Sequence, residues 1–274
     1  MTSAKSARRK AAAEARPGLD AQRRAAVHLR ALRLAYGIIA WSLFLLVAIS
    51  ALLPLLLLPR LGQRRALIRH LARAVLALCG MRLRLRGLDT LPVPSIVVAN
   101  HASYLDGVVL AASLPPCFGF VIKREMSRVP LAGLLLRRIG AEFVERNNRL
   151  RGARDTRRLL RQAASGQALA FFPEGTFEAA PGLLRFHIGA FAAAARAGLP
   201  VVPIALRGTR HCLPADTIWP RPGRIDIEAL PTLPAAAPEA TAEHAARLRD
   251  AARTALLSAL GEPDLAGPSA TDDT

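Results

Sequence analysis

Short apolar runs alternate with helical segments from residue 81 to residue 229, and this alternation strongly limits the folds open to the chain. Each run ends in turn residues, as buried strands commonly do. Strands are predicted at 81–87, 95–99, 118–122, 141–144, 168–172, 201–206 and 224–229. Helices are predicted at 104–113, 129–139, 151–165 and 187–197, with a final amphipathic helix at 241–260. The pattern predicts an α/β fold whose mostly parallel sheet is covered by helices on both faces.

The residues before this α/β region divide into a polar arm and an apolar run. Residues 1–33 hold nine Lys and Arg against two Asp and Glu, a net charge of +7, and we expect a basic, partly disordered arm. Leu34 to Leu58 carries no charged residue. A helix of that length would span about 37 Å, enough for the hydrocarbon core of a membrane. A buried core helix is the alternative, whereas arm and run are both too long for a secretory signal peptide.

Residues 60–86 combine arginines with leucines and valines at helical spacing. This pattern indicates either a basic amphipathic helix at a membrane or a surface helix on the domain. Basic residues thus flank the apolar run on both sides, which opposes a simple transmembrane span. Pro54 also interrupts the run. We therefore expect residues 34–80 to form a kinked pair of membrane-embedded or amphipathic helices that enters the membrane from one side.

The α/β domain is expected at 81–261, and the acidic stretch 262–274 is expected to be a disordered tail. The formal net charge of +18 attracts polyanions such as anionic lipid head groups, phosphorylated substrates or nucleic acid. Aromatic residues make up only 5% of the chain, which disfavours a stacking platform for bases. The three cysteines form no Cys-x-x-Cys pair. Neither a zinc site nor a disulfide framework is predicted, and a reducing compartment is expected.

Two predicted strands end in ionisable residues, and the first is followed by Asn-His-Ala-Ser-Tyr-Leu-Asp at 100–106. Ligands of open α/β sheets bind beyond the carboxyl ends of strands, so an active site is expected here. Ser103 is a good N-cap and Asp106 completes a capping-box pattern, which keeps His101 in the turn and within reach of Asp106. A His-Asp pair without a nucleophile suits a general base that deprotonates a substrate hydroxyl. As the alternative, Asp106 only caps the helix.

The second strand end carries Phe-Pro-Glu-Gly-Thr at 172–176. Pro173 and Gly175 are expected to fix a turn that exposes the Glu174 carboxylate. Arg146 follows the short strand at 141–144, where its guanidinium could bind a phosphate through paired hydrogen bonds. Taken alone, Arg146 could equally be an ordinary surface arginine, and Pro-Glu-Gly turns occur in many loops.

Together these motifs resemble those of the glycerolipid acyltransferase family, which includes the 1-acylglycerol-3-phosphate acyltransferases and other lysophospholipid acyltransferases. Four blocks match in order: Asn-His-x-x-x-x-Asp at 100–106, Gly-x-x-Phe-Val-x-Arg at 140–146, Phe-Pro-Glu-Gly-Thr at 172–176 and Val-Val-Pro-Ile at 201–204. Residues 122–126 and 129–130 resemble the family's usual Lys-x-Glu-Leu and following Pro. The similarity covers residues 81–215, and the N-terminal apolar segment also fits the family.

The resemblance implies transfer of a fatty acyl group from acyl-CoA or acyl carrier protein to the free hydroxyl of a lysophospholipid such as 1-acylglycerol-3-phosphate, in phospholipid biosynthesis. It implies no metal and no bound cofactor. His101 would be the catalytic base and Asp106 its orienting partner. The resemblance places substrate binding on the remaining motif residues, Asn100, Lys123, Arg146, Glu174, Gly175 and Thr176.

One departure from the family concerns the acceptor. The third block commonly continues with Thr-Arg-Ser, whereas this chain has Phe177 and Glu178 after Thr176, and Arg185 could supply the missing arginine. The lyso-form of an amino-acid lipid and a non-lipid hydroxyl therefore stay open as acceptors. A remote alternative is a non-enzymatic basic protein that binds membranes or nucleic acid.

The expected partners are membrane lipids and the acyl donor, with no nucleic acid. We expect the protein to associate with the cytoplasmic face of the inner (plasma) membrane, because the apolar run has basic residues on both sides. The sequence does not indicate an oligomeric state.

Overall fold

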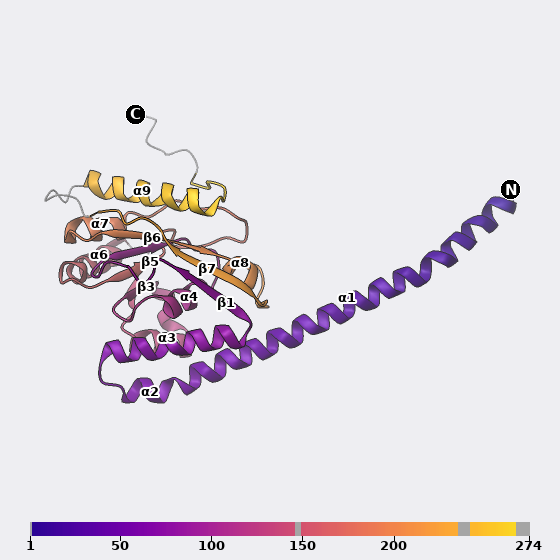
Figure 1. Ribbon diagram of the computed structural model, residues 1–274, viewed down its shortest axis with the longest axis horizontal. Coiled ribbons are helices and arrows are strands. Elements are labelled where there is room, and N and C mark those ends of the chain that lie inside the picture. The colour runs from indigo at the N-terminus through magenta and orange to yellow at the C-terminus, as the bar shows by residue number, and fades with distance from the viewer. Residues whose placement is uncertain (1, 146–148, 235–241, 267–274) are drawn as a thin grey trace.

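The computed structural model describes residues 2–145, 149–234 and 242–266, and it describes side chains from residue 26 onward except those of 149–154 and 156. A seven-stranded sheet forms the middle layer, and helices cover both of its faces (Figure 1). The predicted α/β fold, with a mostly parallel and helix-covered sheet, is confirmed.

The predicted strands and helices of the domain lie within a few residues of their expected positions, and two short helices, at 124–128 and 209–212, were not predicted. The strands are β1 Met81–Arg86, β2 Ile96–Ala99, β3 Gly119–Lys123, β4 Glu142–Val144, β5 Leu169–Phe171, β6 Val201–Arg207 and β7 Gly223–Ala229. The helices are α4 Asp106–Ser113, α5 Pro130–Arg138, α6 Arg149–Ala164, α7 Gly189–Ala197, α8 Thr209–Cys212 and α9 Ala242–Leu260, with a 3-10 helix at Arg124–Arg128.

The strands of the sheet follow the order β1-β7-β6-β2-β5-β3-β4. β2 is parallel to β5 and β6, and β3 is parallel to β4 and β5. β6 and β7 are antiparallel, while β1 is parallel to β7. β1 and β7 therefore begin at the edge of the sheet where β2, β5 and β6 end. This edge, called the carboxyl edge below, carries both sequence motifs.

The core lies on both faces of β2, whose residues Ile96–Ala99 are all buried. Val97 and Ala99 belong to the core under α4 and the helix at Leu61–Leu78. Ile96 and Val98 belong to the core under α6, α7 and α9. Successive side chains of a strand point to opposite faces, so a strand covered on both sides needs apolar residues at every position. This explains the uninterrupted apolar run before His101.

Three helices precede the sheet: α1 Thr2–Ser50, α2 Leu52–Leu57 and α3 Leu61–Leu78. α1 breaks just before Pro54, whose ring and missing N–H disrupt the preceding helical turn. The chain then reverses, and α3 returns toward the domain (Figure 1). The arm at 1–33 differs from its expected partial disorder, because α1 begins at Thr2. Alanine, leucine and arginine, which are frequent in this segment, are strong helix formers.

α3 packs against the domain through its arginines. Arg73 donates to the backbone carbonyl of Ala112 at 2.6 Å, and Arg69 donates to that of Ser113 at 3.3 Å. Arg65 donates to three further backbone carbonyls. The last carbonyls of a helix such as α4 have no partner within the helix, so these guanidinium groups satisfy them. These three arginines therefore face the domain, as the surface-helix alternative requires, and a membrane contact of α3 stays a prediction.

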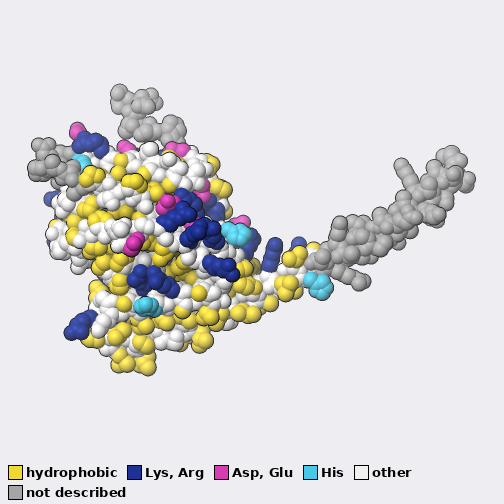
Figure 2. Space-filling model, viewed as in Figure 1, with side chains coloured by type: hydrophobic (Ala, Val, Ile, Leu, Met, Phe, Trp, Pro, Cys, Tyr) yellow, Lys and Arg dark blue, Asp and Glu magenta, His cyan; other side chains and the backbone are white. Residues whose placement is uncertain are grey.

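α1 and α2 leave an apolar face exposed, visible in Figure 2 along the lower side of the molecule. Ile38, Leu46 and Leu57 are 58%, 64% and 72% exposed. Within the described part of the chain, Ala26–Leu57 is the one helical segment long and apolar enough to cross a membrane. Apolar surface of this kind is unfavourable in water. The exposed apolar face and the length of this segment therefore indicate that it associates with a membrane.

Residues 262–266 belong to the stretch expected as a disordered tail, yet they pack against the domain. Glu262 Oε2 accepts the N–H of Gly182 at 2.9 Å, and Leu183 pairs with Asp264 as an isolated β-bridge. Glu262 and Asp264 also pair with Arg210 and Arg253. These contacts offset the conformational entropy that the segment loses when it packs against the domain. Residues 267–274 lie outside the described part of the chain.

Candidate active site

The turn at residues 100–106, called the His101 turn, links β2 to α4 at the carboxyl edge. Its first residue, Asn100, is buried. The Asn100 amide donates to the carbonyl of Leu206 at 3.0 Å and accepts its N–H at 2.7 Å. Because Leu206 lies in β6, these bonds fix the turn to the neighbouring strand. Both ends of the amide are used within the protein, and the predicted substrate contact of Asn100 stays a prediction.

His101 and Asp106 form a hydrogen-bonded pair, as the spacing predicts. His101 Nδ1 lies 2.8 Å from Asp106 Oδ2, and Asp106 is fully buried. The same oxygen accepts the N–H groups of Ala102 at 2.6 Å and Ser103 at 2.9 Å, so it acts as an acceptor. The ring proton therefore lies on Nδ1 and leaves a lone pair on Nε2. The His101 side chain is 18% exposed, so the ring is open to a substrate.

The cap of α4 differs in detail from the predicted one. α4 begins at Asp106, with Leu105 as its N-cap residue and no side-chain cap bond. The Ser103 hydroxyl instead accepts the N–H of Leu105 at 3.0 Å and donates to the carbonyl of Leu213 at 2.6 Å. Asp106 still accepts the N–H of Ser103, which is the reciprocal half of a capping box. The turn is thus closed locally and tied to the loop after α8.

Aromatic rings surround the imidazole. The His101 ring stacks on Phe172 with centroids 4.3 Å apart, and it meets Phe177 at 4.4 Å. Tyr104 contacts Phe177 edge-on at 4.7 Å. These contacts restrict the rotation of the imidazole. No sequence pattern marked these rings as part of the site, although Phe172 and Phe177 flank the Pro-Glu-Gly-Thr motif.

Glu174 lies in the loop 172–184, called the Glu174 loop, and the prediction that its carboxylate is exposed is wrong. The residue is 3% exposed. Oε1 accepts the backbone N–H of His101 at 2.6 Å, and Oε2 accepts that of Leu184 at 2.9 Å. The predicted turn itself is present, with a φ of 77° at Gly175. The carboxylate points inward because two backbone donors lie there, and it ties the end of β5 to the His101 turn.

Burial raises the pKa of Glu174 to about 7. The hydrogen bonds from His101 and Leu184 oppose this rise, and the nearby carboxylates of Asp106 and Glu262 add to it. Glu174 therefore exchanges a proton near neutral pH while it holds the backbone of His101.

Two of the predicted substrate-binding residues, Lys123 and Thr176, lie at or after the ends of strands that finish at the carboxyl edge. Lys123 ends β3, is exposed, and has its Nζ 3.8 Å from Glu125. Thr176 is exposed directly after Gly175. Arg146 lies outside the described residues. The roles assigned to these residues stay predictions.

Arg185 runs beside the Glu174 turn. Arg185 is exposed, and residues on both sides of it in the chain form hydrogen bonds to the Phe-Pro-Glu-Gly-Thr motif. The N–H of Leu184 binds Glu174, and the N–H of His187 donates to the carbonyl of Pro173 at 2.8 Å. The backbone on both sides of Arg185 thus lies against the Glu174 turn, and its substitution for the missing arginine stays a prediction.

An ion network at the end of β4 was not predicted from the sequence. Asp155, in α6, is buried and accepts the N–H of Glu145 at 2.9 Å. Its carboxylate also pairs with Arg124 at 2.8 Å and Arg158 at 3.1 Å. The network fixes the last described residue of the Gly-x-x-Phe-Val-x-Arg block. Its members come from three separate elements, so no local motif signals it.

No group of three or more His, Cys, Asp or Glu side chains is placed to hold a metal ion in the described ranges. The predicted lack of a metal or bound cofactor stays a prediction.

Comparison with known proteins gives consistent matches. The Acyltransferase family model matches residues 82–207. The chain is 34% identical over 248 residues to the 1-acyl-sn-glycerol-3-phosphate acyltransferase of Chlamydomonas reinhardtii, across 85% of this chain and 70% of that protein. It is 34% identical over 154 residues to the lyso-ornithine lipid O-acyltransferase of Rhizobium meliloti, across 56% of this chain and 51% of that protein. For this and six other curated relatives, the chain spans between 33% and 56% of their length.

The fold is similar to the crystal structure of the 1-acyl-sn-glycerophosphate acyltransferase from Thermotoga maritima. The TM-score is 0.69 at 18% identity, and the match covers 84% of this chain and 96% of that one. At this identity the likeness concerns the fold alone. It extends well beyond residues 82–207, to most of the chain.

Proposed function

This chain belongs to the acyltransferase family, and we propose that it transfers a fatty acyl group from acyl-CoA or acyl carrier protein to the free hydroxyl of a lysophospholipid such as 1-acylglycerol-3-phosphate. One observation supports this more than any other. Asp106, fully buried, holds His101 Nδ1 at 2.8 Å and leaves Nε2 as an acceptor. We further propose that the reaction needs no bound metal or cofactor.

The proposed reaction follows from this pair. His101 Nε2 takes the proton of the acceptor hydroxyl as the oxygen adds to the thioester carbon of the donor. Asp106 keeps the proton on Nδ1 and stabilises the imidazolium that forms. When the C–S bond breaks, the proton passes from Nε2 to the departing thiolate. The products are the new ester and a free thiol.

Recognition of the acceptor phosphate is assigned to the basic residues of the motifs. Lys123 ends β3, and Arg185 lies beside the Glu174 turn. Arg146 belongs to the same block as Glu145, whose backbone the Asp155 network fixes. Arginine and lysine bind phosphate through charge-assisted hydrogen bonds. Gly175 and Thr176 are proposed to position the acceptor, while Glu174 acts through the backbone of His101.

A second candidate acceptor is the lyso-form of an amino-acid lipid. Phe177 stands where the family commonly has an arginine, and its ring meets the imidazole of His101 at 4.4 Å. An apolar ring in that position weakens the case for an acceptor phosphate. The similarity to lyso-ornithine lipid O-acyltransferases from two bacteria supports the same candidate.

We also propose that the membrane-associated segment enters the cytoplasmic leaflet of the inner membrane without crossing it. α1, α2 and α3 form a reversing unit, and α3 is fixed to the domain by its arginines. The domain and both ends of the apolar run then stay on one side, as the positive-inside bias favours.

The reaction is tested with His101→Ala. We expect acyl transfer to fall by roughly a hundredfold to ten-thousandfold, because the general base is lost. The assay measures thiol release from acyl-CoA and from acyl carrier protein against a panel of lysophospholipids and lyso-ornithine lipid. His70→Ala is the matched control, since His70 is exposed on α3. Turnover near that of the unmodified protein for His101→Ala, with the fold and membrane binding intact, would refute this mechanism.

A further inference from the structure

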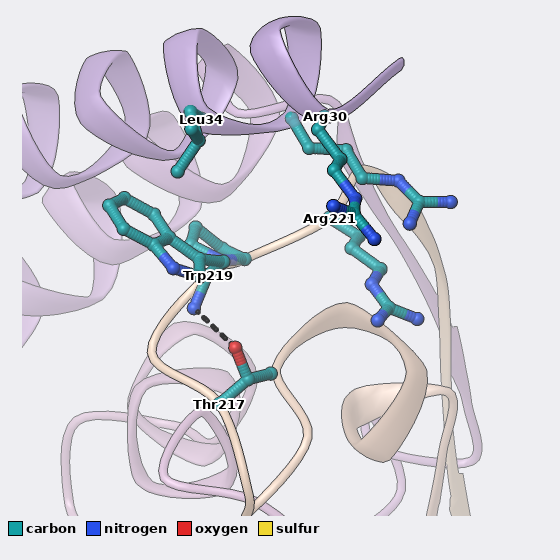
Figure 3. A pocket seen from close by; sticks show the side chains of 7 residues that line it. Arg30, Leu34, Thr217, Trp219 and Arg221 are labelled. Carbon is teal, nitrogen blue, oxygen red and sulfur yellow. Dashed lines mark hydrogen bonds between the residues drawn. The ribbon is translucent and has the colours of Figure 1, made fainter. Parts of the chain in front are cut away.

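A pocket lies where α1 meets the loop between α8 and β7. Its volume is about 290 Å³. Figure 3 shows Leu34 pointing from the helix toward the Trp219 indole, with Arg30 and Arg221 beside them. None of the lining residues belongs to the His101 turn or to the Glu174 loop. The lining comprises Arg30, Arg33, Leu34, Thr217, Trp219, Pro220 and Arg221.

The walls of this pocket are fixed by specific contacts. Trp41 Nε1 donates to the carbonyl of Ile218 at 2.7 Å, which ties the loop to α1. Gly37 leaves room for Trp219, because a Cβ at that position would clash with the indole ring. The N–H of Arg221 donates to the carbonyl of the last residue of α8 at 2.7 Å. The loop therefore holds Trp219 and Arg221 at the helix surface.

Positive charge in the pocket is unbalanced. Arg30, Arg33 and Arg221 are all exposed, and none forms an ion pair with a described residue. No lining residue is acidic. Like charges grouped around one pocket repel, and a bound anion relieves that repulsion. The guanidinium fork matches the geometry of phosphate oxygens, so a phosphate is the anion that this group fits.

The rim of the pocket is apolar and continuous with the exposed face of α1. Leu34 is 45% exposed, Ile38 58% and Ile218 66%. Trp219 is 36% exposed, and tryptophan is enriched where a membrane meets water. A nucleic acid or a free phosphate would use the arginines but not this apolar rim. A phospholipid uses both.

We propose that this pocket binds the phosphate of an anionic phospholipid headgroup, while the acyl chains lie along the exposed apolar face of α1. The bound lipid belongs to the surrounding membrane and is not consumed. This binding goes beyond the proposed acyl transfer. It adds a headgroup contact to the apolar contact that α1 makes with the membrane.

Trp219 fluorescence provides the test. The chain has two tryptophans, so Trp41→Phe isolates the signal of Trp219. The full-length Trp41→Phe protein is reconstituted in phosphatidylcholine vesicles with increasing fractions of phosphatidylglycerol, and we expect a saturable change in emission. Inorganic phosphate added to phosphatidylcholine vesicles should give no such change. The unmodified protein should show the same midpoint, which checks that Trp41→Phe leaves the loop in place.

Charge variants identify the pocket. Each basic residue near an anionic surface contributes roughly a fivefold gain in affinity, so Arg30→Gln, Arg33→Gln and Arg221→Gln together should weaken the response about a hundredfold. Arg161→Gln, Arg196→Gln and Arg247→Gln remove the same charge from exposed positions on other helices, and they should leave the response intact. The pocket variant should keep its turnover on acceptor dispersed in detergent. That result separates lipid binding from catalysis.

Three results would overturn the assignment. They are equal responses of the two triple variants, a response to phosphatidylcholine alone, and a response to inorganic phosphate that matches the one to phosphatidylglycerol. If the triple variant of the pocket does not fold, the single variant Arg221→Gln provides the test. It should weaken the response roughly fivefold, and an unchanged midpoint would refute the site.

Discussion

The His101 turn and the Glu174 loop deliver the two halves of the site, and they are held in place in different ways. The His101 turn closes on itself, because Asp106 accepts the ring N–H of His101 and two backbone N–H groups within the same seven-residue segment. The Glu174 loop is also held from outside. Its far end is held by residues from the C-terminal part of the chain.

Those C-terminal contacts are numerous. Glu262 accepts the N–H of Gly182 at 2.9 Å. Arg253, in α9, donates to the carbonyls of Leu183 at 2.9 Å and Leu184 at 3.2 Å. Leu184 in turn donates its N–H to Glu174, so the support reaches the buried carboxylate through one residue. The approach of His101 to Asp106 thus depends on local geometry, whereas the far end of the Glu174 loop depends on packing between distant segments.

Asp106→Asn tests the local half and should have the largest effect. The amide can present its NH₂ to the ring, which favours the wrong tautomer of His101. We expect turnover to fall by roughly ten-thousandfold, as in other His-Asp pairs that lose tautomer control. Steady-state thiol release measures the change. Asp250→Asn is the matched control, since Asp250 is exposed on α9 and pairs with its neighbour Arg249.

A turnover within tenfold of the unmodified protein would show that Asp106 only caps α4. The local half would then contribute structure and not chemistry.

Glu174→Gln tests the link between the two halves. One backbone N–H of the pair from His101 and Leu184 would face the new NH₂ group, which costs about 1–3 kcal/mol of folding stability. The pH dependence of the free energy of unfolding is a more specific test of Glu174. Because burial raises the pKa of Glu174 to about 7, the folded protein keeps this proton over a range in which the unfolded chain has lost it.

The contribution of Glu174 to the free energy of unfolding therefore decreases as pH rises from about 4.5 to about 7. One pKa unit corresponds to about 1.4 kcal/mol, so this decrease amounts to at most about 3.5 kcal/mol. Thermal unfolding across this range measures it. Glu174→Gln should lose that part of the pH dependence, whereas Glu178→Gln, at an exposed position, should keep it. The same pH profile in all three proteins would contradict the raised pKa of the buried Glu174 carboxyl.

Glu262→Ala tests the distant support and should have the smallest effect. Loss of the bond to Gly182 and of the ion pair with Arg210 should cost about 1–2 kcal/mol of stability and only several-fold in turnover. Hydrogen exchange of the Gly182 and Leu184 amides should increase. Glu243→Ala is the control, because Glu243 is exposed at the start of α9. Unchanged exchange at Gly182 and Leu184 would show that the loop holds itself.

The same contrast explains what the sequence could and could not predict. The strands, the helices and the approach of His101 to Asp106 follow from apolar periodicity and from a five-residue spacing, both of which are local. The burial of Glu174 depends on donors in His101 and Leu184, and the latter is positioned from α9. Turn chemistry alone predicted an exposed carboxylate there. The Asp155 network and the aromatic walls around His101 likewise join separate elements, which only the folded chain brings together.

The antiparallel pairing of β6 with β7 has a consequence for how a lipid acceptor is encountered. Because β1 runs parallel to β7, the chain passes from α3 into β1 at the carboxyl edge, which also carries His101. α3, the last of the three N-terminal helices, therefore ends at the edge that carries the reacting imidazole. Such an enzyme meets its acceptor in two dimensions, and its rate follows the mole fraction of acceptor in the leaflet. Diluting the acceptor with inert lipid would slow the reaction even when the total amount in the sample stays the same.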